Sequence, residues 1–449
     1  KDVSMSLRQL SIQWKITLLA GLCLAGIVTL LVGLSLYRME HSAALVKTSS
    51  MEMLTEAAQA RIESQGENQA LEIRQQFMDA YQYGHGFSRQ VLFLRDQAEK
   101  RFLDAFDLRE DLTRQVKSAL QANPELLGLS LVFEANALDG KDDLFTGQAE
   151  LGSNDKGRFA LYWSQPTPGK VTSMALPESD MADTGTGPSG EPANAWFTCP
   201  RTTLKPCVIE PYFYVIDGQK VLMTSIVFPL MVNGKVIASL SADINLNSLQ
   251  AVSQGASKKL YDGQTNVSII SPVGLLAGYS PDASKLSQRL DAVDPTNGAE
   301  LIRMLAAGSQ TKSLHSNQQL KVLAPFQPIP GGKSWGVLLE VPEKVLVGPA
   351  EALKKQLDDS NTAGTLMELG LGALAALIGL LLVWLMARSV TKPILGVAHM
   401  LEDIASGEGD LTRRLAYDKQ DELGQLAGWF NRFLDKLQPI IAEVKRSVQ

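Results

Sequence analysis

The sequence predicts an α+β membrane protein, in which a long helix and two antiparallel-sheet modules lie between two membrane-spanning helices. Three observations predict this class. Two uncharged apolar blocks are each long enough to cross a bilayer. The chain between them opens with a proline-free stretch rich in Glu, Gln, Ala, Arg and Leu, which is typical of a long helix. Short apolar runs separated by turn residues follow, as expected for strands.

Composition excludes several other classes. Hydrophobic residues make up 45% of the 449 residues and charged residues 20%, which excludes a disordered or collagen-like chain. The net charge of −6 excludes the strongly basic surface with which a protein binds nucleic acid without reading its bases. We therefore expect no nucleic-acid partner.

The two apolar blocks span residues 16–37 and 369–387. At about 1.5 Å per residue, the first forms a helix about 33 Å long, enough to cross a hydrocarbon core of about 30 Å. It is too long for the apolar core of a signal peptide, and no small-residue cleavage site closes it. We expect two retained transmembrane helices.

Basic residues beside the spans predict the orientation. Arg8 and Lys15 precede the first span, and Arg388 and Lys392 follow the second. Positive charge marks the cytoplasmic side, so both termini are expected in the cytoplasm and residues 38–368 outside the inner membrane. Residues 1–15 then form a cytoplasmic N-terminus, of which 1–4 are interpreted as a tag remnant ahead of Met5.

The cysteines agree with an oxidising compartment. Cys199 and Cys207 lie in the translocated part with two prolines between them, and we expect a local disulfide. Cys23 lies inside the first span, where we expect it to pack. A zinc site would need two further ligands, but the four histidines (His41, His85, His315 and His399) are scattered, so no metal and no cofactor are predicted.

The translocated part divides after Ala122. The stretch from Tyr37 to about Ala122 is the predicted long helix, with residues 84–86 as the candidate interruption because of their two glycines. Strands are predicted at 129–133, 159–163, 208–214, 221–228 and 236–244, and a second set at 267–271, 275–278, 321–326 and 335–341. Asn233-Gly234 between two apolar runs predicts a hairpin.

A shift of 98 residues indicates an internal repeat. It aligns Phe228 with Phe326, residues 234–235 with 332–333, and Asp243 with Val341. The first copy thus ends its last strand with a carboxylate and the second with Val341-Pro342. We expect a polar ligand in the first copy.

Three short segments carry a family resemblance. Glu210-Pro-Tyr-Phe-Tyr214, Leu222-Met-Thr-Ser225 and Ala242-Asp-Ile244 follow one another between the two spans. Together with the long helix and two modules, residues 40–350 resemble the double Cache (dCache) sensor domains of bacterial chemoreceptors and sensor kinases, whose modules are PAS-like. The resemblance implies a membrane-distal, ligand-binding module at about 123–250 and a membrane-proximal, transmitting module at about 260–345.

Asp243 is the central candidate for ligand binding. A carboxylate at the end of an apolar strand is costly unless it is paired, so it either caps the following helix or meets a cation. In the amino-acid and amine receptors that this chain resembles, the matching Asp holds the ammonium group of the ligand.

Aromatic residues are expected around this carboxylate, where ring faces would suit an ammonium or quaternary ammonium ion. The alternative is that each ring simply belongs to the core. Strand alternation allows at most one of Tyr162 and Trp163 to face the ligand. The candidate ligand-binding residues are Asp243, Tyr212, Tyr214, Trp163, Tyr162, Arg158 and Trp196.

Two departures from the family pattern favour an amine over an α-amino acid. The run from Arg158 to Trp163 has a different spacing from the Arg, one residue, Trp-Tyr pattern of the amino-acid receptors. Tyr214 stands where those receptors carry a second Asp. A cationic amine or quaternary ammonium compound is the first choice, and an amino acid, a purine or another small polar metabolite remains the alternative.

The segment after the second span predicts a signalling module. Apolar residues recur with heptad-like spacing in two stripes, and such helices need a second chain to form a parallel four-helix bundle. Residues 388–438 resemble a HAMP domain, with Pro393 starting a helix and Asp421, Glu422 and Gly424 as its signature. We interpret Asp418, Asp421 and Glu422 as helix-start residues. The stripes are Ile394, Val397, Leu401 and Ile404, then Leu423, Leu426, Phe430, Phe433 and Leu437.

The resemblance implies a homodimeric methyl-accepting chemotaxis receptor of the bacterial inner membrane, truncated after HAMP, with residues 439–449 beginning a signalling helix. Its partners would be a small-molecule chemoeffector, membrane lipid, and a cytoplasmic chemotaxis kinase and adaptor. The sequence shows no phosphate-binding glycine loop, kinase core or nucleophilic triad, so we expect no enzyme activity. Alternatives are the same sensor coupled to a histidine kinase or a diguanylate cyclase, and a binding module without signalling.

Overall fold

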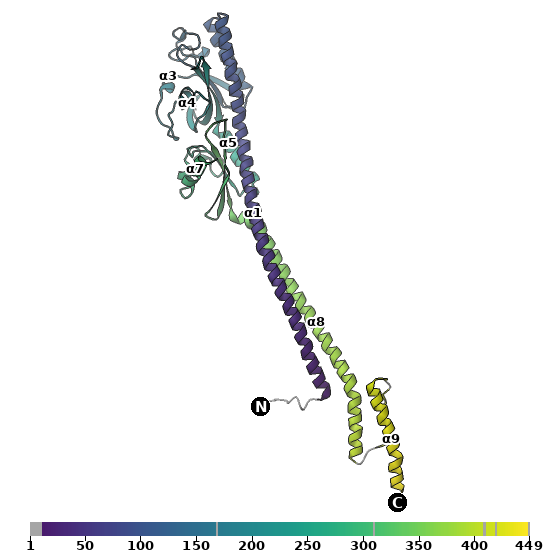
Figure 1. Cartoon of the computed structure of the whole chain (residues 1–449). Coiled ribbons are helices and arrows are strands. Elements are labelled where there is room, and N and C mark those ends of the chain that lie inside the picture. The colour runs from purple at the N-terminus through teal and green to yellow at the C-terminus, as the bar shows by residue number, and fades with distance from the viewer. Residues whose placement is uncertain (1–10, 168, 309, 407–409, 418–419, 448–449) are drawn as a thin grey trace. The chain divides into compact units, whose positions relative to one another are not determined.

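The computed structural model describes residues 11–167, 169–308, 310–406, 410–417 and 420–447. It separates into two compact units. One unit is Glu52–Ala350, which holds both sheets, and the other combines the two ends of the chain (Figure 1). The mixed helix and sheet architecture confirms the predicted fold class.

The long helix is continuous where an interruption was predicted. Helix α1 runs from Ile12 to Lys100 through residues 84–86, so that prediction was wrong. Its first break comes after Lys100, where Phe102 adopts a left-handed conformation, and α2 (Ala105–Gln121) then begins with the Asp104 side chain accepting a hydrogen bond from the Phe106 backbone NH. Gly84 has a packing role, because an added Cβ would lie 2.4 Å from the Phe228 ring.

The first module is built on a seven-stranded antiparallel sheet of order β3-β2-β1-β7-β6-β4, with β5 also paired to β6. Its hairpin at Asn233-Gly234 is confirmed, since Val232 pairs with Lys235 around two residues of positive φ. The predicted run 208–214 is divided into two strands, and β3 was not predicted. The strands are β1 (Gly128–Phe133), β2 (Ala160–Thr167), β3 (Lys170–Ala175), β4 (Cys207–Val208), β5 (Tyr212–Ile216), β6 (Gln219–Val232) and β7 (Lys235–Asn245).

The second module is built on a five-stranded antiparallel sheet of order β10-β11-β12-β8-β9. This order matches β5-β6-β7-β1-β2 of the first module, and the common topology supports the predicted internal repeat. Strand β10 was not predicted. The strands are β8 (Asn266–Ile270), β9 (Leu276–Tyr279), β10 (Lys312–Ser316), β11 (Gln319–Phe326) and β12 (Trp335–Pro342).

Short helices cover the outer faces of the sheets and connect the modules. In the first module these are α3 (Glu178–Ala182) and α4 (Ala195–Thr203), and α5 (Leu246–Lys259) leads into the second. The second module contributes α6 (Leu290–Val293) and α7 (Gly298–Ala307). Single 3-10 turns occur at Asp142–Phe145, Ala149–Leu151, Tyr261–Gly263 and Ala283–Lys285.

Helix α1 supports both modules, along whose sheets it runs in Figure 1. Its Phe77 ring lies 5.1 Å from the Trp335 ring of the second module, and its Tyr81 ring lies 5.5 Å from the Phe228 ring of the first. Both sheets therefore share one continuous apolar core with α1, and this core lies on the opposite sheet face from α3, α4, α6 and α7.

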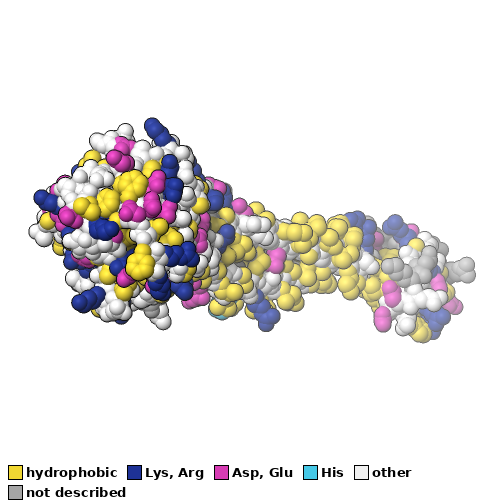
Figure 2. Space-filling view, turned by 90° about the horizontal axis from the view of Figure 1, so that it is seen from above, with side chains coloured by type: hydrophobic (Ala, Val, Ile, Leu, Met, Phe, Trp, Pro, Cys, Tyr) yellow, Lys and Arg dark blue, Asp and Glu magenta, His cyan; other side chains and the backbone are white. Residues whose placement is uncertain are grey.

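The unit formed by the chain ends holds two helices long and apolar enough to cross a membrane. Residues 16–37 lie in α1 and residues 369–387 in α8 (Glu343–Ala405), and their apolar side chains cover the surface of the helix pair (Figure 2). Glycines let the two helices approach closely, since a Cβ at Gly379 would lie 2.3 Å from Leu24. Cys23 is exposed on α1, contrary to the expectation that it packs.

Two helix starts predicted at prolines are not present. Helix α8 continues through Pro393, and α9 (Glu422–Ser447) continues through Pro439. A proline inside a helix removes one hydrogen bond and can kink the helix without ending it. The start of α9 agrees with the prediction, because Asp421 accepts a hydrogen bond from the Gly424 backbone NH at 2.8 Å. Asp418 lies outside the described residues.

The packing of α1 makes a matched pair of glycine substitutions informative. We predict that Gly84→Ala lowers the melting temperature of the whole chain, because the added methyl group collides with Phe228. Gly86→Ala is the control, since nothing lies within 4 Å of its Cβ position and alanine favours helix by about 1 kcal/mol over glycine. Thermal unfolding in lipid nanodiscs measures both. Equal effects of the two substitutions would contradict the packing role of Gly84.

Candidate ligand-binding site

The candidate site lies on the face of the seven-stranded sheet that faces away from α1. A small cavity is enclosed there by side chains from β1, β2, β5, β6, β7 and α4. Its volume is about 20 Å³, about the space of one water molecule, so a larger ligand must push side chains apart. The lining residues are Ser130, Tyr162, Leu176, Trp196, Tyr212, Tyr214, Met223, Ser241 and Asp243.

Asp243 is a buried carboxylate at the centre of this site. It is only 3% exposed, in β7 between Gly128 of β1 and Ser225 of β6. The Ser225 hydroxyl donates a hydrogen bond to Asp243 Oδ1 at 2.7 Å. Among the residues that the structure describes, none forms an ion pair with it. Burial raises the pKa of Asp243 to about 6, although the Ser225 and Ser241 hydroxyls lower it in part.

Tyrosine rings surround the carboxylate. The Tyr212 hydroxyl lies 2.8 Å from Ser225 Oγ, and the Tyr162 and Tyr214 rings meet edge to face at 6.0 Å. Burial, reinforced by the Asp243 charge, raises the pKa of Tyr162 and Tyr212 well above the usual value, so both hydroxyls stay neutral. The Tyr162 hydroxyl is buried and makes no well-formed hydrogen bond in the described part of the chain, although it lies near enough to Asp243 to lower the pKa of that carboxyl. This leaves a polar group available to a ligand.

The structure gathers five of the seven predicted residues in the cavity: Tyr162, Trp196, Tyr212, Tyr214 and Asp243. The other two lie outside its lining. Trp163 follows Tyr162 in a strand and therefore faces the opposite side, with Lys117 Nζ 5.1 Å from its ring centre. Arg158 precedes β2 and pairs with Glu178 at 2.7 Å.

The capping alternative for Asp243 is wrong. Helix α5 is capped by Asn245, whose side chain accepts a hydrogen bond from the Asn247 backbone NH at 2.9 Å. Asp243 lies two residues earlier, inside β7. The start of helix α5 therefore does not explain why the Asp243 carboxylate is buried.

Several site residues could not be recognised from the sequence alone. Ser241 shares a strand face with Asp243 and could have been found by alternation. Ser225 and Gly128 pair with Asp243 across neighbouring strands, and recognising them requires knowledge of the strand register. Gly128 is needed because an added Cβ would lie 2.5 Å from the Tyr162 hydroxyl oxygen.

Comparisons with known proteins agree with this architecture. A HAMP domain model matches residues 385–438, close to the predicted 388–438. The methyl-accepting chemotaxis protein TlpQ of Pseudomonas aeruginosa is 63% identical over 445 residues, which are 99% of this chain and 62% of that protein. The chain is a homologue of methyl-accepting chemotaxis proteins.

A second curated relative is more distant. The methyl-accepting chemotaxis protein McpA of Pseudomonas putida is 28% identical to this chain over 332 residues, which are 72% of this chain and 46% of McpA. This chain thus spans about half to two thirds of the length of these relatives.

Solved structures show the same fold in sensor domains. The periplasmic sensory domain of the Campylobacter jejuni chemoreceptor Tlp1 matches with a TM-score of 0.52 at 12% identity, covering 66% of this chain and 99% of that one. The extracellular domain of mmHK1S-Z3, a protein described as a histidine kinase, matches with a TM-score of 0.51 at 19% identity over 66% and 98% of the two chains. The predicted Cache-type architecture is confirmed.

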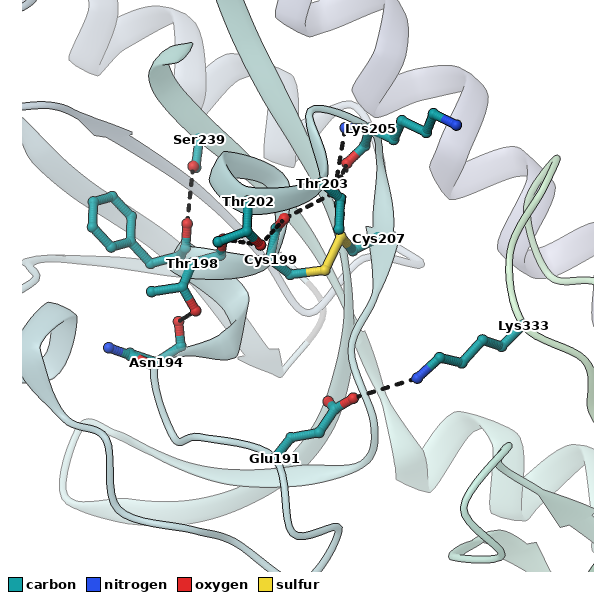
Figure 3. Close-up of a disulfide and its surroundings, with 11 residues drawn as sticks. Glu191, Asn194, Thr198, Cys199, Thr202, Thr203, Lys205, Cys207, Ser239 and Lys333 are labelled. Atoms are coloured by element: carbon teal, nitrogen blue, oxygen red, sulfur yellow. Dashed lines mark hydrogen bonds and ion pairs between the residues drawn. A yellow bond between two sulfur atoms is a disulfide. The ribbon is translucent and has the colours of Figure 1, made fainter. Parts of the chain in front are cut away.

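A disulfide lies beside one wall of the cavity. The predicted bond between Cys199 and Cys207 is present and joins α4 to β4 (Figure 3). Trp196 lies one turn before Cys199 on α4 and lines the cavity. The described residues contain no group of three or more His, Cys, Asp or Glu side chains arranged to hold a metal ion.

The second module differs from the first at the corresponding position. Asn266, which lies two residues before Ser268, pairs with Glu340. In the same way Gly128, two residues before Ser130, pairs with Asp243. The counterpart of Asp243 is therefore Glu340, and the predicted alignment with Val341 is wrong by one residue, since Val341 faces the α1 core. Glu340 already forms an ion pair with Lys321, whereas Asp243 has no such partner among the described residues.

Proposed function

We propose that this chain is the sensory and membrane-spanning part of a chemotaxis receptor, and that its first module binds a small organic ammonium ion around Asp243. One observation supports this most directly. The Asp243 carboxylate is 3% exposed and accepts hydrogen bonds from neutral hydroxyls, and within the described ranges no Lys, Arg or His side chain forms an ion pair with it. A cationic ligand would supply a positive charge.

The rest of the cavity suits such a ligand. An ammonium group would make a charge-assisted hydrogen bond to Asp243, and the faces of Tyr162, Tyr212, Tyr214 and Trp196 would attract its positive charge. These rings would also pack against an apolar portion of the ligand. Neither Arg158 nor another basic side chain lines the cavity to hold a ligand carboxylate, which favours an amine over an α-amino acid.

Binding would move the wall of the cavity toward the second module. Because the cavity has room for about one water, a ligand must displace rings such as Tyr212. Two residues before Tyr212 lies Glu210, which is 3% exposed and contacts the Ser271 side chain and the Val273 backbone in the turn between β8 and β9. Burial raises the pKa of Glu210 to about 7, although the Ser271 contact lowers it in part.

The two modules are linked by a short path of bonded residues. Asp243 accepts from Ser225, and the Ser225 backbone oxygen accepts from the Ile209 NH at 2.9 Å, one residue before Glu210. A longer contact, 3.9 Å between Lys333 and Glu191, also crosses between the modules (Figure 3). Strand β12 of the second module continues directly into α8.

The signal would then reach the cytoplasm as a population shift. A ligand that favours one conformation of the first module biases the second module, α8 and the HAMP domain in turn. In this proposal residues 38–368 are periplasmic, both termini are cytoplasmic, and two chains pair their HAMP helices in a four-helix bundle. A cytoplasmic kinase and adaptor are the output partners, and the chain itself catalyses no reaction.

An amine panel tests the ligand class. We predict that phenethylammonium or tetramethylammonium raises the melting temperature of the whole chain in nanodiscs, because a ligand at 100 times its Kd adds about 2.7 kcal/mol of stability. Phenethyl alcohol, which lacks the charge, should give no shift. In the Asp243→Asn variant the amine shift should disappear. Shifts only with amino acids, purines or carboxylates, or an amine shift that survives Asp243→Asn, would contradict the proposed site.

A second experiment tests the path through Glu210. We predict that at about pH 8, where a carboxyl with a pKa of about 7 is mostly ionised, Glu210→Gln leaves phenethylammonium affinity within about threefold but abolishes the ligand-induced change in hydrogen exchange of residues 266–280, because the neutral amide no longer holds that turn as a charged group. Glu191→Gln is the matched control and should retain the change, since its ion pair is long and exposed. Persistence of the change in Glu210→Gln would rule out this path.

A further inference from the structure

The second module holds a buried ammonium group of its own. Lys321 of β11 is 4% exposed, and its Nζ lies 2.8 Å from Asp294 Oδ2 and also contacts Glu340 Oε1. Burial lowers the pKa of Lys321, but the hydrogen bonds to Asp294 and Glu340 outweigh that effect and leave the pKa above its usual value. The side chain is therefore a charged ammonium ion enclosed by two carboxylates.

Strand pairing places this ammonium where the first module has its candidate site. Lys321 pairs with Glu340 across β11 and β12, and Ser225 pairs with Asp243 across the corresponding β6 and β7. The neighbouring positions also match, since Ser268 pairs with Tyr279 as Ser130 pairs with Tyr162. Lys321 thus takes the place of Ser225, and its long side chain delivers a cation to the carboxylate.

We propose that Lys321 is a built-in ligand of the second module, which fills the amine position from within the chain. Leucines of α6 and α7, namely Leu290, Leu301 and Leu305, pack beside it on the same face of the sheet, where the first module has its cavity. The second module is thereby held in the form that an amine would stabilise, whatever the amine concentration outside. Only the first module responds to external ligand, and the second acts as a pre-ordered relay.

This inference rests on the proposed function only in comparing Lys321 with the amine that we propose for the first module. Its test does not depend on that amine. The Lys321→Ala substitution removes the side chain from Cγ to Nζ, and these atoms are the three carbons and the nitrogen of n-propylammonium. The experiment uses the whole chain in nanodiscs, with Asp243→Asn present throughout so that the first module cannot contribute. Hydrogen exchange of residues 319–326 and 335–342 reports on β11 and β12.

We expect Lys321→Ala to raise exchange in these two strands at least tenfold at pH 7.5, because the buried Glu340 and the partly buried Asp294 lose their cation. n-Propylammonium should restore protection with saturable dose dependence, and n-propanol should not. Lys321→Met keeps most of the apolar stem without the charge, and should also exchange faster. Wild-type protection in Lys321→Met, or no more protection of Lys321→Ala by n-propylammonium than by n-propanol, would overturn the proposal.

Discussion

A carboxyl group removed from water must be compensated by a cation, by hydrogen bonds or by a proton, and the two modules differ in which of these they use. In the second module, Glu340 and Asp294 enclose the ammonium of Lys321, which belongs to the same chain. In the first module, Asp243 holds the equivalent place, where the groups of the described chain that interact with its carboxylate are neutral hydroxyls, among them Ser225 and Ser241. The same fold therefore contains one acidic site that is neutralised by a lysine of the chain and one acidic site where burial raises the pKa of the carboxyl to about 6.

The position of these sites explains how, in the proposed function, ligand binding in the first module affects the second module. Both sheets pack on α1 through one continuous core, so the modules share a rigid support. One contact between them is that of Glu210, which is buried, with the turn between β8 and β9. A cavity with room for about one water cannot admit an amine without moving its wall, and that wall includes Tyr212, two residues from Glu210. In the proposed function, ligand entry would therefore move a wall that lies two residues from a contact with the second module.

The sequence predicts the fold well where the signals are local, and less well where the structure depends on contacts between segments far apart in the sequence. The Asn233-Gly234 hairpin, the disulfide and most first-module strands, though not β3, follow from turn chemistry and periodicity. The continuity of α1 at Gly84 does not, because local propensity disfavours glycine in a helix and the reason for this glycine, the close approach of the Phe228 ring, lies in a distant segment. Asp243 and four aromatic residues of the site were predictable from strand patterns and family resemblance. Ser225, Gly128 and the role of Lys321 depend on cross-strand register, which no single segment encodes.

Proton release on ligand binding tests most directly whether Asp243 receives the cation. With a pKa of about 6, Asp243 is about half protonated at pH 6, and an ammonium ligand must displace that proton. Calorimetric titration with phenethylammonium, in buffers of different ionisation enthalpy and in the Glu210→Gln background, should show about half a proton released at pH 6 and almost none at pH 8. Binding at pH 6 without proton release would contradict the account.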